Sequence, residues 1–220
     1  MILAFEQSSR RGSIALCRAS ETLAHREWDD PLARHTRMGP ALQELLKESA
    51  LQWDALTAIA VGRGPGSFSG LRAAITTARV LAAPSAIPVM ALSSGAALAH
   101  DWFSRNPTVA TPLVVAGDAR RGAIWYAVFH PNTPGMRPST DWTLAPAAEF
   151  SARLPANATL ATSDRARLLA ALGDAASALE PIEEVFPTAT ALAHLAQMRF
   201  DASLPSEPPE PLYLHAATLA

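Results

Sequence analysis

The densest group of glycines lies between an apolar run that ends at Val61 and a helix-forming segment that begins near Leu71. Glycines stand at positions 62, 64, 66 and 70, so the backbone there is free to adopt angles that other residues avoid. A turn of this kind between a strand and a helix points N–H groups outward, where they hold an anion or seat a side chain of a partner. The same pattern also fits a structural turn that binds no ligand.

Three familiar enzymatic interpretations of this turn fail on spacing. A phosphate-binding Walker loop needs a lysine after its last glycine, whereas the single lysine of the chain is Lys47. A nucleophile elbow needs serine at its centre, where this sequence has Phe68. A dinucleotide fingerprint that starts at Gly64 needs its third glycine at the position of Ser69.

Histidines and serines give no further catalytic pattern. The six histidines are scattered without the spacing of metal ligands, so no metal site is predicted. No histidine–aspartate pair can be assigned to a serine nucleophile. Ser67 and Ser69 are instead candidate N-caps of the helix that follows the glycine-rich turn.

Composition narrows the class of protein. Hydrophobic residues make up 49% and charged residues 17% of the 220 residues, which favours a surface that meets a protein partner. The net charge of −2 gives no basic footprint for gripping a nucleic acid directly. One cysteine, Cys17, excludes an internal disulfide and fits the cytoplasm, and neither a signal peptide nor a membrane span is predicted.

The elements expected in the first half follow the order of a ribonuclease-H-like lobe, with three strands and then alternating helices and strands. The expected strands are Ile2–Phe5, Ser13–Cys17, Leu23–Trp28, Ala58–Gly62 and Val89–Leu92, and the expected helices are Ala33–Ala50, Ser69–Leu81 and Ser93–Phe103. We therefore expect an α/β protein whose first lobe covers residues 1–105 and is rejoined by residues 206–220.

The second half begins after a hinge predicted at Asn106-Pro107 and forms a smaller lobe over residues 106–205. It opens with another strand hairpin, turned by Asp118–Gly122, and continues with short elements. The expected strands are Leu113–Gly117, Ala123–Phe129 and one near Asp141–Leu144, and the expected helices are Ala147–Leu154, Arg165–Leu172 and Ala189–Phe200.

Five segments resemble those of the TsaB (YeaZ-like) family of bacterial tRNA threonylcarbamoyladenosine biosynthesis proteins. The glycine-rich turn resembles the hallmark of the family, with Ser69 where threonine is usual. The other four segments are Met1–Ser9, His35–Leu46, Gly117–Gly122 and Pro211–Leu214. The resemblance implies a two-lobed actin-like, sugar-kinase-like fold, duplicated from a ribonuclease-H-like unit, with an abbreviated second lobe.

The resemblance also implies a non-catalytic subunit in the complex that makes N6-threonylcarbamoyladenosine at position 37 of tRNA. Such a subunit pairs with the catalytic subunit TsaD, helps recruit the small ATPase TsaE, forms a homodimer when alone, and meets tRNA only indirectly. Two helices of the first lobe would form the interface. The residues expected there are Met38, Leu42, Leu45, Phe68, Leu71, Arg72, Ile75 and Arg79.

In actin-like ATPases two hairpin turns, one from each lobe, hold phosphates and a metal. The matching residues here are Glu6, Ser8 and Arg10 in one turn and Asp118 and Arg120 in the other. Glu6-Gln7 replaces the usual Asp-Thr pair, and no Gly-Gly adenosine turn follows in the second half. We expect no cofactor of its own and a vestigial cleft, leaving open ATP or ADP with magnesium at a subunit interface.

Two alternatives remain open from the sequence. One is an independent ATP-dependent enzyme of the sugar-kinase class that uses Glu6 and Asp118 around magnesium. The other is a self-associating module without a role on tRNA. His215 stands where the family commonly has arginine, which puts any contact made by the tail in doubt.

Overall fold

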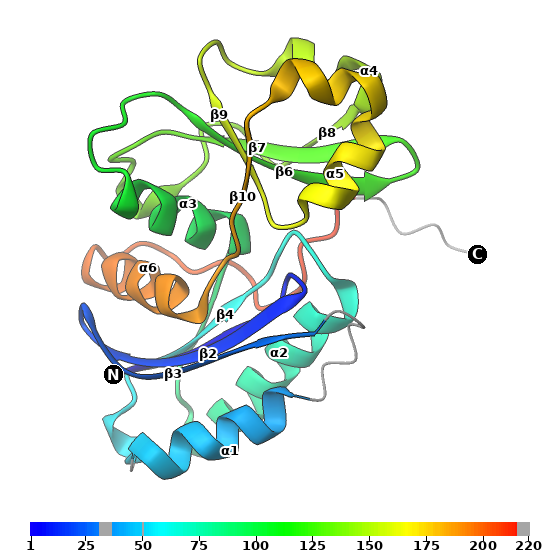
Figure 1. Cartoon of the computed structure of the whole chain (residues 1–220). Coiled ribbons are helices and arrows are strands. Elements are labelled where there is room, and N and C mark those ends of the chain that lie inside the picture. The colour runs from blue at the N-terminus through cyan, green and yellow to red at the C-terminus, as the bar shows by residue number, and fades with distance from the viewer. Residues whose placement is uncertain (31–36, 50, 215–220) are drawn as a thin grey trace. The chain divides into compact units, whose positions relative to one another are not determined.

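A computed structural model of the chain describes residues 1–30, 37–49 and 51–214, and it divides them into two units. The first unit combines Met1–Ala97 with Pro187–Leu212, and the second contains Leu98–Phe186 and the described residues from Tyr213 on. Each unit is built on its own five-stranded sheet (Figure 1). The prediction of an α/β protein is confirmed.

The sheet of the first unit has the strand order β3-β2-β1-β4-β5. The first three strands pair antiparallel, while β4 and β5 add in parallel. Parallel pairs need a helical crossover, and helices fill these connections. The elements are β1 (Ile2–Glu6), β2 (Arg11–Arg18), β3 (Glu21–Asp29), α1 (Met38–Ser49), η1 (Trp53–Ala55), β4 (Ala58–Gly62), α2 (Phe68–Ala82), η2 (Ala83–Ser85), β5 (Val89–Leu92) and α6 (Ala189–Asp201). The boundary between the two units falls within the remaining helix, α3 (Ser94–Arg105).

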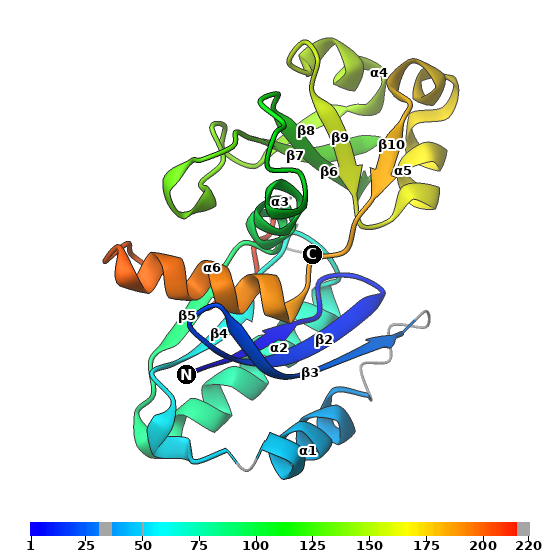
Figure 2. The same cartoon turned by 60° about the vertical axis from the view of Figure 1, so that its left-hand side comes forward.

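Helices cover both faces of the first sheet. Helices α1 and α2 lie side by side on one face, and α6 covers the other (Figures 1 and 2). Leu3 and Phe5 of β1 point toward α1 and α2 because side chains alternate along a strand. The central strands β1 and β4 are buried along their whole length, which explains their nearly continuous apolar sequence.

The second unit repeats this arrangement with shorter helices. Its strand order is β10-β9-β6-β7-β8, with β6, β7 and β8 antiparallel and β9 and β10 added in parallel. Helices α4 and α5 share a core with one face of this sheet. The elements are β6 (Leu113–Arg120), β7 (Ala123–Phe129), η3 (Pro134–Met136), β8 (Thr143–Pro146), α4 (Ala147–Phe150), η4 (Ser151–Arg153), β9 (Thr159–Thr162), α5 (Arg165–Leu172), η5 (Gly173–Leu179) and β10 (Ile182–Glu184).

The predicted division at residues 105/106 and 205/206 differs from the division seen in the structure. Helix α6 belongs to the first unit, because its apolar side packs on β1, β2 and β4 and the Ala189 N–H donates to Ser13 Oγ at 2.8 Å. The boundary near the predicted hinge falls instead inside α3, after Ala97. The expected start of the first helix at Ala33 and its end at Ala50 lie outside the described residues, as does His215.

Candidate functional site

The glycine-rich turn joins β4 to α2 and is packed against the turn between β1 and β2. The Ser67 N–H donates to the Ser8 carbonyl at 2.7 Å. A Cβ atom placed on Gly66 would lie 2.2 Å from that same carbonyl oxygen, and Gly66 has a φ of +157°. Only glycine allows the two backbones to approach so closely.

The start of α3 braces the turn from a second direction. The Gly64 N–H donates to Ser94 Oγ at 3.1 Å, and the Ser94 N–H donates to the Gly64 carbonyl at 2.9 Å. Ser93 Oγ donates to the same carbonyl at 3.2 Å. The sequence predicted N–H groups that point outward, but those of Arg63, Gly64, Ser67 and Gly70 all have partners within the unit.

Ser67 is the N-cap of α2. It is one of the two serines, Ser67 and Ser69, that the sequence suggested for this role. Its Oγ accepts a hydrogen bond from the Gly70 N–H at 3.4 Å. Such a cap satisfies one of the N–H groups that a helix leaves unpaired at its start. The glycine-rich turn is therefore a rigid connection that fixes where α2 begins and which of its sides faces the sheet.

Glu6, at the end of β1, lies beneath this turn and is only 1% exposed. Its Oε1 accepts the Ser8 N–H at 2.7 Å, while Oε2 is buried and has no hydrogen-bond partner among the described residues. A Cβ atom on Gly62 would lie 2.0 Å from Oε2. Burial raises the pKa of Glu6, and the hydrogen bonds to Ser8 offset this only in part.

The buried Glu6 carboxyl does not fit the role of a magnesium ligand, because both oxygens are enclosed by the protein. Ser8 is buried as well, and Arg10 pairs with Asp29 at 3.8 Å. In the second unit, Asp118 Oδ1 accepts the Arg120 N–H at 2.7 Å, so this carboxylate holds its own hairpin turn. The residues predicted for a vestigial cleft are thus distributed over both units.

The eight residues predicted for a partner interface divide into two groups. Met38, Leu45, Leu71 and Ile75 are buried within the unit itself, so their side chains are not exposed to a partner in the single chain. They point toward the sheet because each follows the apolar side of its amphipathic helix. Leu42 is half-buried, whereas Phe68, Arg72 and Arg79 are exposed.

The exposed residues form a continuous strip along α2, which we call the α2 outer face. It contains two large apolar side chains, Phe68 and Val80, which are 56% and 65% exposed. Between them stand Arg72, Thr76 and Arg79, and the Arg72 guanidinium lies 5.2 Å from the centre of the Phe68 ring. Val80 was not among the predicted residues, although it lies about three turns after Phe68 and helical spacing places it on the same side of α2.

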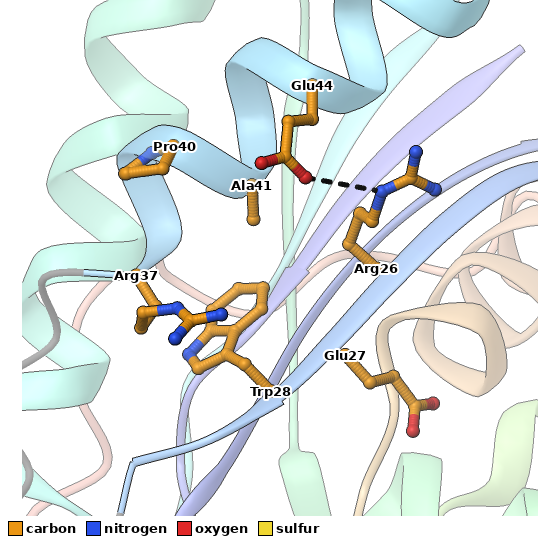
Figure 3. A pocket seen from close by; sticks show the side chains of 7 residues that line it. All are labelled: Arg26, Glu27, Trp28, Arg37, Pro40, Ala41 and Glu44. Carbon is orange, nitrogen blue, oxygen red and sulfur yellow. Dashed lines mark ion pairs between the residues drawn. The ribbon is translucent and has the colours of Figure 1, made fainter.

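A hollow of about 220 Å³ lies between β3 and α1 (Figure 3). Arg26 on its rim pairs with Glu44 at 3.7 Å and also with Glu48, so acids of α1 already compensate this charge. The buried indole of Trp28 forms part of the wall. The hollow was not foreseen from the sequence, because its residues come from two elements that only the fold brings together. They are Arg26, Glu27, Trp28, Arg37, Pro40, Ala41 and Glu44.

Two further findings concern the part of the chain that the structure describes. Its histidine, cysteine and acidic side chains do not gather in groups of three or more that suit a metal ion. Its helices are all too short or too polar to cross a bilayer. The α2 outer face and the turn that positions it therefore remain the best-defined candidate site.

Comparisons with known proteins agree with this geometry. The family model described as TsaD, tRNA N6-adenosine threonylcarbamoyltransferase, matches residues 33–135. A curated relative, the tRNA threonylcarbamoyladenosine biosynthesis protein TsaB of Escherichia coli K12, is 32% identical over 135 residues, which are 61% of this chain and 57% of the relative. The protein of the same name from Haemophilus influenzae is 33% identical over 129 residues, 57% of this chain and 52% of that protein.

The fold has a solved counterpart along nearly its whole length. The structure of YeaZ from Pseudomonas aeruginosa matches with a TM-score of 0.74 at 25% identity, covering 97% of this chain and 99% of that one. In sequence, the chain spans about half the length of the curated relatives it matches. The matched segments include both the glycine-rich turn and α2. The chain is therefore similar to TsaB and YeaZ proteins in sequence and structure, and it has the actin-like fold.

Proposed function

We propose that this chain takes part in forming N6-threonylcarbamoyladenosine in tRNA as a non-catalytic subunit that docks the α2 outer face onto a TsaD-like catalytic protein. The names of the curated relatives support the pathway. This chain matches the TsaD family model, so a TsaD-like protein would share its fold. Such a partner would carry helices equivalent to α1 and α2, and the two pairs of helices could pack against each other. In this proposal the chain positions its partner and carries out no chemistry of its own.

The observation that carries the proposal is the exposure of Phe68 and Val80 on one side of α2. Apolar surface in water is unfavourable by about 25 cal/mol per Å², so covering both side chains favours association. Arg72 and Arg79 stand beside them and would form charge-assisted hydrogen bonds with carboxylates of a partner. Aromatic residues and arginine are enriched in the cores of protein interfaces, which fits Phe68 and Arg72.

Neighbouring features extend the α2 outer face into a two-helix surface. Ala73 and Thr76 are small, which lets a helix of the partner approach closely. Helix α1 lies beside α2 on the same face of the sheet, and its Leu42 remains half-buried (Figure 2). The buried residues Leu45 and Ile75 would act indirectly, by holding both helices on the sheet.

The remaining parts of the proposal concern the other partners. The same surface would pair two copies of this chain when no TsaD-like protein is present, so the homodimer and the heterodimer compete for it. Net charge of −2 supports contact with tRNA through the partner rather than directly. We further propose that the assembled pair recruits the ATPase TsaE in the cytoplasm, where tRNA is modified.

A docking assay tests the proposed surface. Phe68→Glu and Val80→Glu place a charge at the centre of the interface, and each should weaken binding to the TsaD-like protein of the same organism at least about tenfold. Phe200→Glu is the matched control, because Phe200 is 51% exposed but lies on α6, on the opposite face of the sheet. Titration by calorimetry or biolayer interferometry measures the effect.

Circular dichroism should show that all three variants are folded, since each residue is exposed. If Phe68→Glu and Val80→Glu bind as tightly as the wild-type chain, or no more weakly than Phe200→Glu, the docking proposal is wrong. Gel filtration of the isolated variants tests the homodimer with the same substitutions.

A reconstitution assay tests the non-catalytic role. Omitting this chain should abolish or strongly reduce tRNA modification, while the chain alone should turn over no ATP with magnesium. Glu6→Ala should leave modification intact if Glu6 is a buried structural group. ATP turnover by the isolated chain that disappears in Glu6→Ala and in Asp118→Ala would instead favour an independent ATP-dependent enzyme.

A further inference from the structure

The hollow between β3 and α1, which we call the α1 hollow, has a lining that mixes apolar and charged groups (Figure 3). The buried indole of Trp28, together with Pro40 and Ala41 of α1, gives it apolar walls. Its volume of about 220 Å³ lies below the range of roughly 300–1,000 Å³ that is typical of sites for drug-sized ligands. A water molecule takes up about 30 Å³, so the α1 hollow suits a small chemical group rather than a nucleotide.

Three of the charges around the α1 hollow already compensate one another. Arg26 pairs with Glu44 at 3.7 Å and also with Glu48, so its guanidinium is not available to hold a ligand. Glu27 is exposed, and Figure 3 shows its carboxylate pointing away from the other labelled side chains. The charge that remains to be accounted for is that of Arg37.

Arg37 lies at the start of α1, and no acid compensates it among the described residues. Its carbonyl accepts the Ala41 N–H at 3.0 Å, which is the hydrogen-bond pattern of a residue at the beginning of a helix. The N–H groups of Met38 and Gly39 fall in the first turn, where a helix leaves its N–H groups without intrahelical partners. That turn contains no acidic residue, so the guanidinium and the positive end of the helix dipole reinforce each other.

The wall of the α1 hollow contains another donor that is not used within the described part of the chain. Trp28 is only 7% exposed, and its Nε1 is buried without a hydrogen-bond partner there. The neighbouring Gln7 amide does not satisfy it, although Gln7 Oε1 and Trp28 Nε1 both lie 2.5 Å from the position of a Cβ atom placed on Gly12. Figure 3 shows the indole nitrogen on the side of Arg37. A buried donor without an acceptor is unfavourable, so an acceptor placed in the α1 hollow would be stabilising.

These features favour a carboxylate as the ligand. A carboxylate oxygen accepts hydrogen bonds from guanidinium, indole and backbone N–H groups, and its single negative charge matches the single charge of Arg37. A phosphate with two negative charges would bring the second one close to Glu27 and Glu44, which repel it. Pro40 and Ala41 suit the short carbon chain that carries a carboxylate.

We propose that the α1 hollow binds a carboxylate group, carried either by a small organic acid or by an aspartate or glutamate side chain of a docked protein. Arg37 would hold the carboxylate through charge-assisted hydrogen bonds, and the first turn of α1 would add its dipole and its N–H groups. The residues of this site come from β3 and the start of α1, so it is separate from the α2 outer face. The inference does not depend on the proposed docking function.

Nuclear magnetic resonance of the isolated chain tests the proposal. The chain has five tryptophans, and the indole N–H signal of Trp28 is identified by its loss in Trp28→Phe. Sodium acetate, at ionic strength matched with sodium chloride, should shift this signal in a saturable way. Sodium phosphate in the same titration should bind more weakly than acetate. Tighter binding of phosphate would contradict the choice of a carboxylate.

Variants of Arg37 show whether its guanidinium holds the ligand. Arg37→Ala should weaken acetate binding at least about tenfold, because the charged donor is lost. Arg37→Lys should keep part of the affinity, since it retains the charge but not the planar fork. Arg121→Ala is the matched control, because Arg121 is also exposed but lies in the turn between β6 and β7 of the second unit, and it should bind acetate like the wild-type chain. Circular dichroism verifies that all three variants are folded.

A docking assay distinguishes the two sources of the carboxylate. If Arg37→Ala weakens binding to a TsaD-like protein while Arg121→Ala does not, and acetate competes with the wild-type pair, the carboxylate belongs to the partner. Docking that Arg37→Ala leaves unchanged assigns the site to a free organic acid. Two results with the isolated chain overturn the proposal itself. One is a Trp28 signal that acetate shifts no more than matched chloride does, and the other is an acetate response that Arg37→Ala retains at the affinity of the wild-type chain.

Discussion

The two units share one sheet topology and differ in what connects the strands. In each, three antiparallel strands are followed by two parallel ones, β1 to β5 in the first unit and β6 to β10 in the second. The first unit fills its crossovers with α1 and α2, of 12 and 15 residues. The second uses α4 and α5, of 4 and 8 residues. A repeated sheet therefore fixes the architecture, while the length of the crossover helices decides which unit offers a long docking surface.

The turns at equivalent places differ in the same way. In the first unit the turn after β4 is rich in glycine, and it packs so closely against Glu6 that the Glu6 carboxyl is buried. In the second unit the turn after β9 has no glycine, and Asp164 caps α5 from an exposed position. The turn of the first unit requires two backbone segments to approach each other closely, whereas the turn of the second unit is held by a charged side chain that water reaches.

The largest expected difference concerns one glycine in a turn of each unit, Gly66 after β4 and Gly122 between β6 and β7. Gly66→Ala should destabilise the first unit by about 3 kcal/mol or more, because the new Cβ meets the Ser8 carbonyl oxygen at 2.2 Å. Gly122→Ala in the hairpin turn of the second unit has open space around it and a φ of +73°, so it should cost only about 1–2 kcal/mol. Urea unfolding followed by circular dichroism measures both.

Hydrogen exchange assigns each loss to its unit. Equal destabilisation by Gly66→Ala and Gly122→Ala would show that the close packing of the glycine-rich turn contributes nothing beyond its backbone angles. A larger loss for Gly122→Ala would contradict the comparison outright.

A smaller effect is expected from the buried carboxyl of Glu6. Burial raises its pKa, so the folded state holds the proton more tightly than the unfolded state does. The stability that this proton provides is fully present below the ordinary glutamate pKa of about 4.3 and is lost as the pH rises through the raised value. Glu6→Gln should therefore become increasingly more stable than the wild-type chain as the pH rises above that range.

Thermal unfolding of both proteins at several pH values measures this difference. A difference in melting temperature that stays constant with pH would mean that the Glu6 carboxyl has the same pKa in the folded and the unfolded chain. Gln at this position keeps the shape of the side chain, so lost packing does not obscure the result.

The smallest expected effects come from the two helix N-caps. Ser67→Ala removes a long hydrogen bond of 3.4 Å at the start of α2, and it should cost about 0.5 kcal/mol. Asp164→Ala removes a bond of 3.1 Å to the Arg167 N–H and a neighbouring charge at the start of α5, and it should cost about 1 kcal/mol. Urea unfolding of both variants decides the order. A greater loss for Ser67→Ala would show that the cap matters more beside the glycine-rich turn.

Local patterns in the sequence were sufficient for most elements of both units. Alternating and apolar runs predicted β1 to β7, helical spacing predicted α1, and candidate N-caps marked the start of α2. Helices α3, α5 and α6 were also expected close to their observed bounds. The short strands β9 (Thr159–Thr162) and β10 (Ile182–Glu184) were missed, because a run of three or four residues carries too little periodicity. The order of elements also led to the α/β class and, together with the resemblance, to the actin-like fold.

The sequence by itself determined that a glycine-rich turn precedes an amphipathic helix, because backbone freedom and hydrophobic spacing are local properties. Only the tertiary structure decided which side of that helix is covered, and it placed Leu71 and Ile75 inside and Phe68 and Val80 outside. It also decided that Glu6 is enclosed and that Glu207 bridges Arg63 and Arg199, residues that lie far apart along the chain. Burial and long-range charge pairing depend on which segments meet in space, and no local pattern records that.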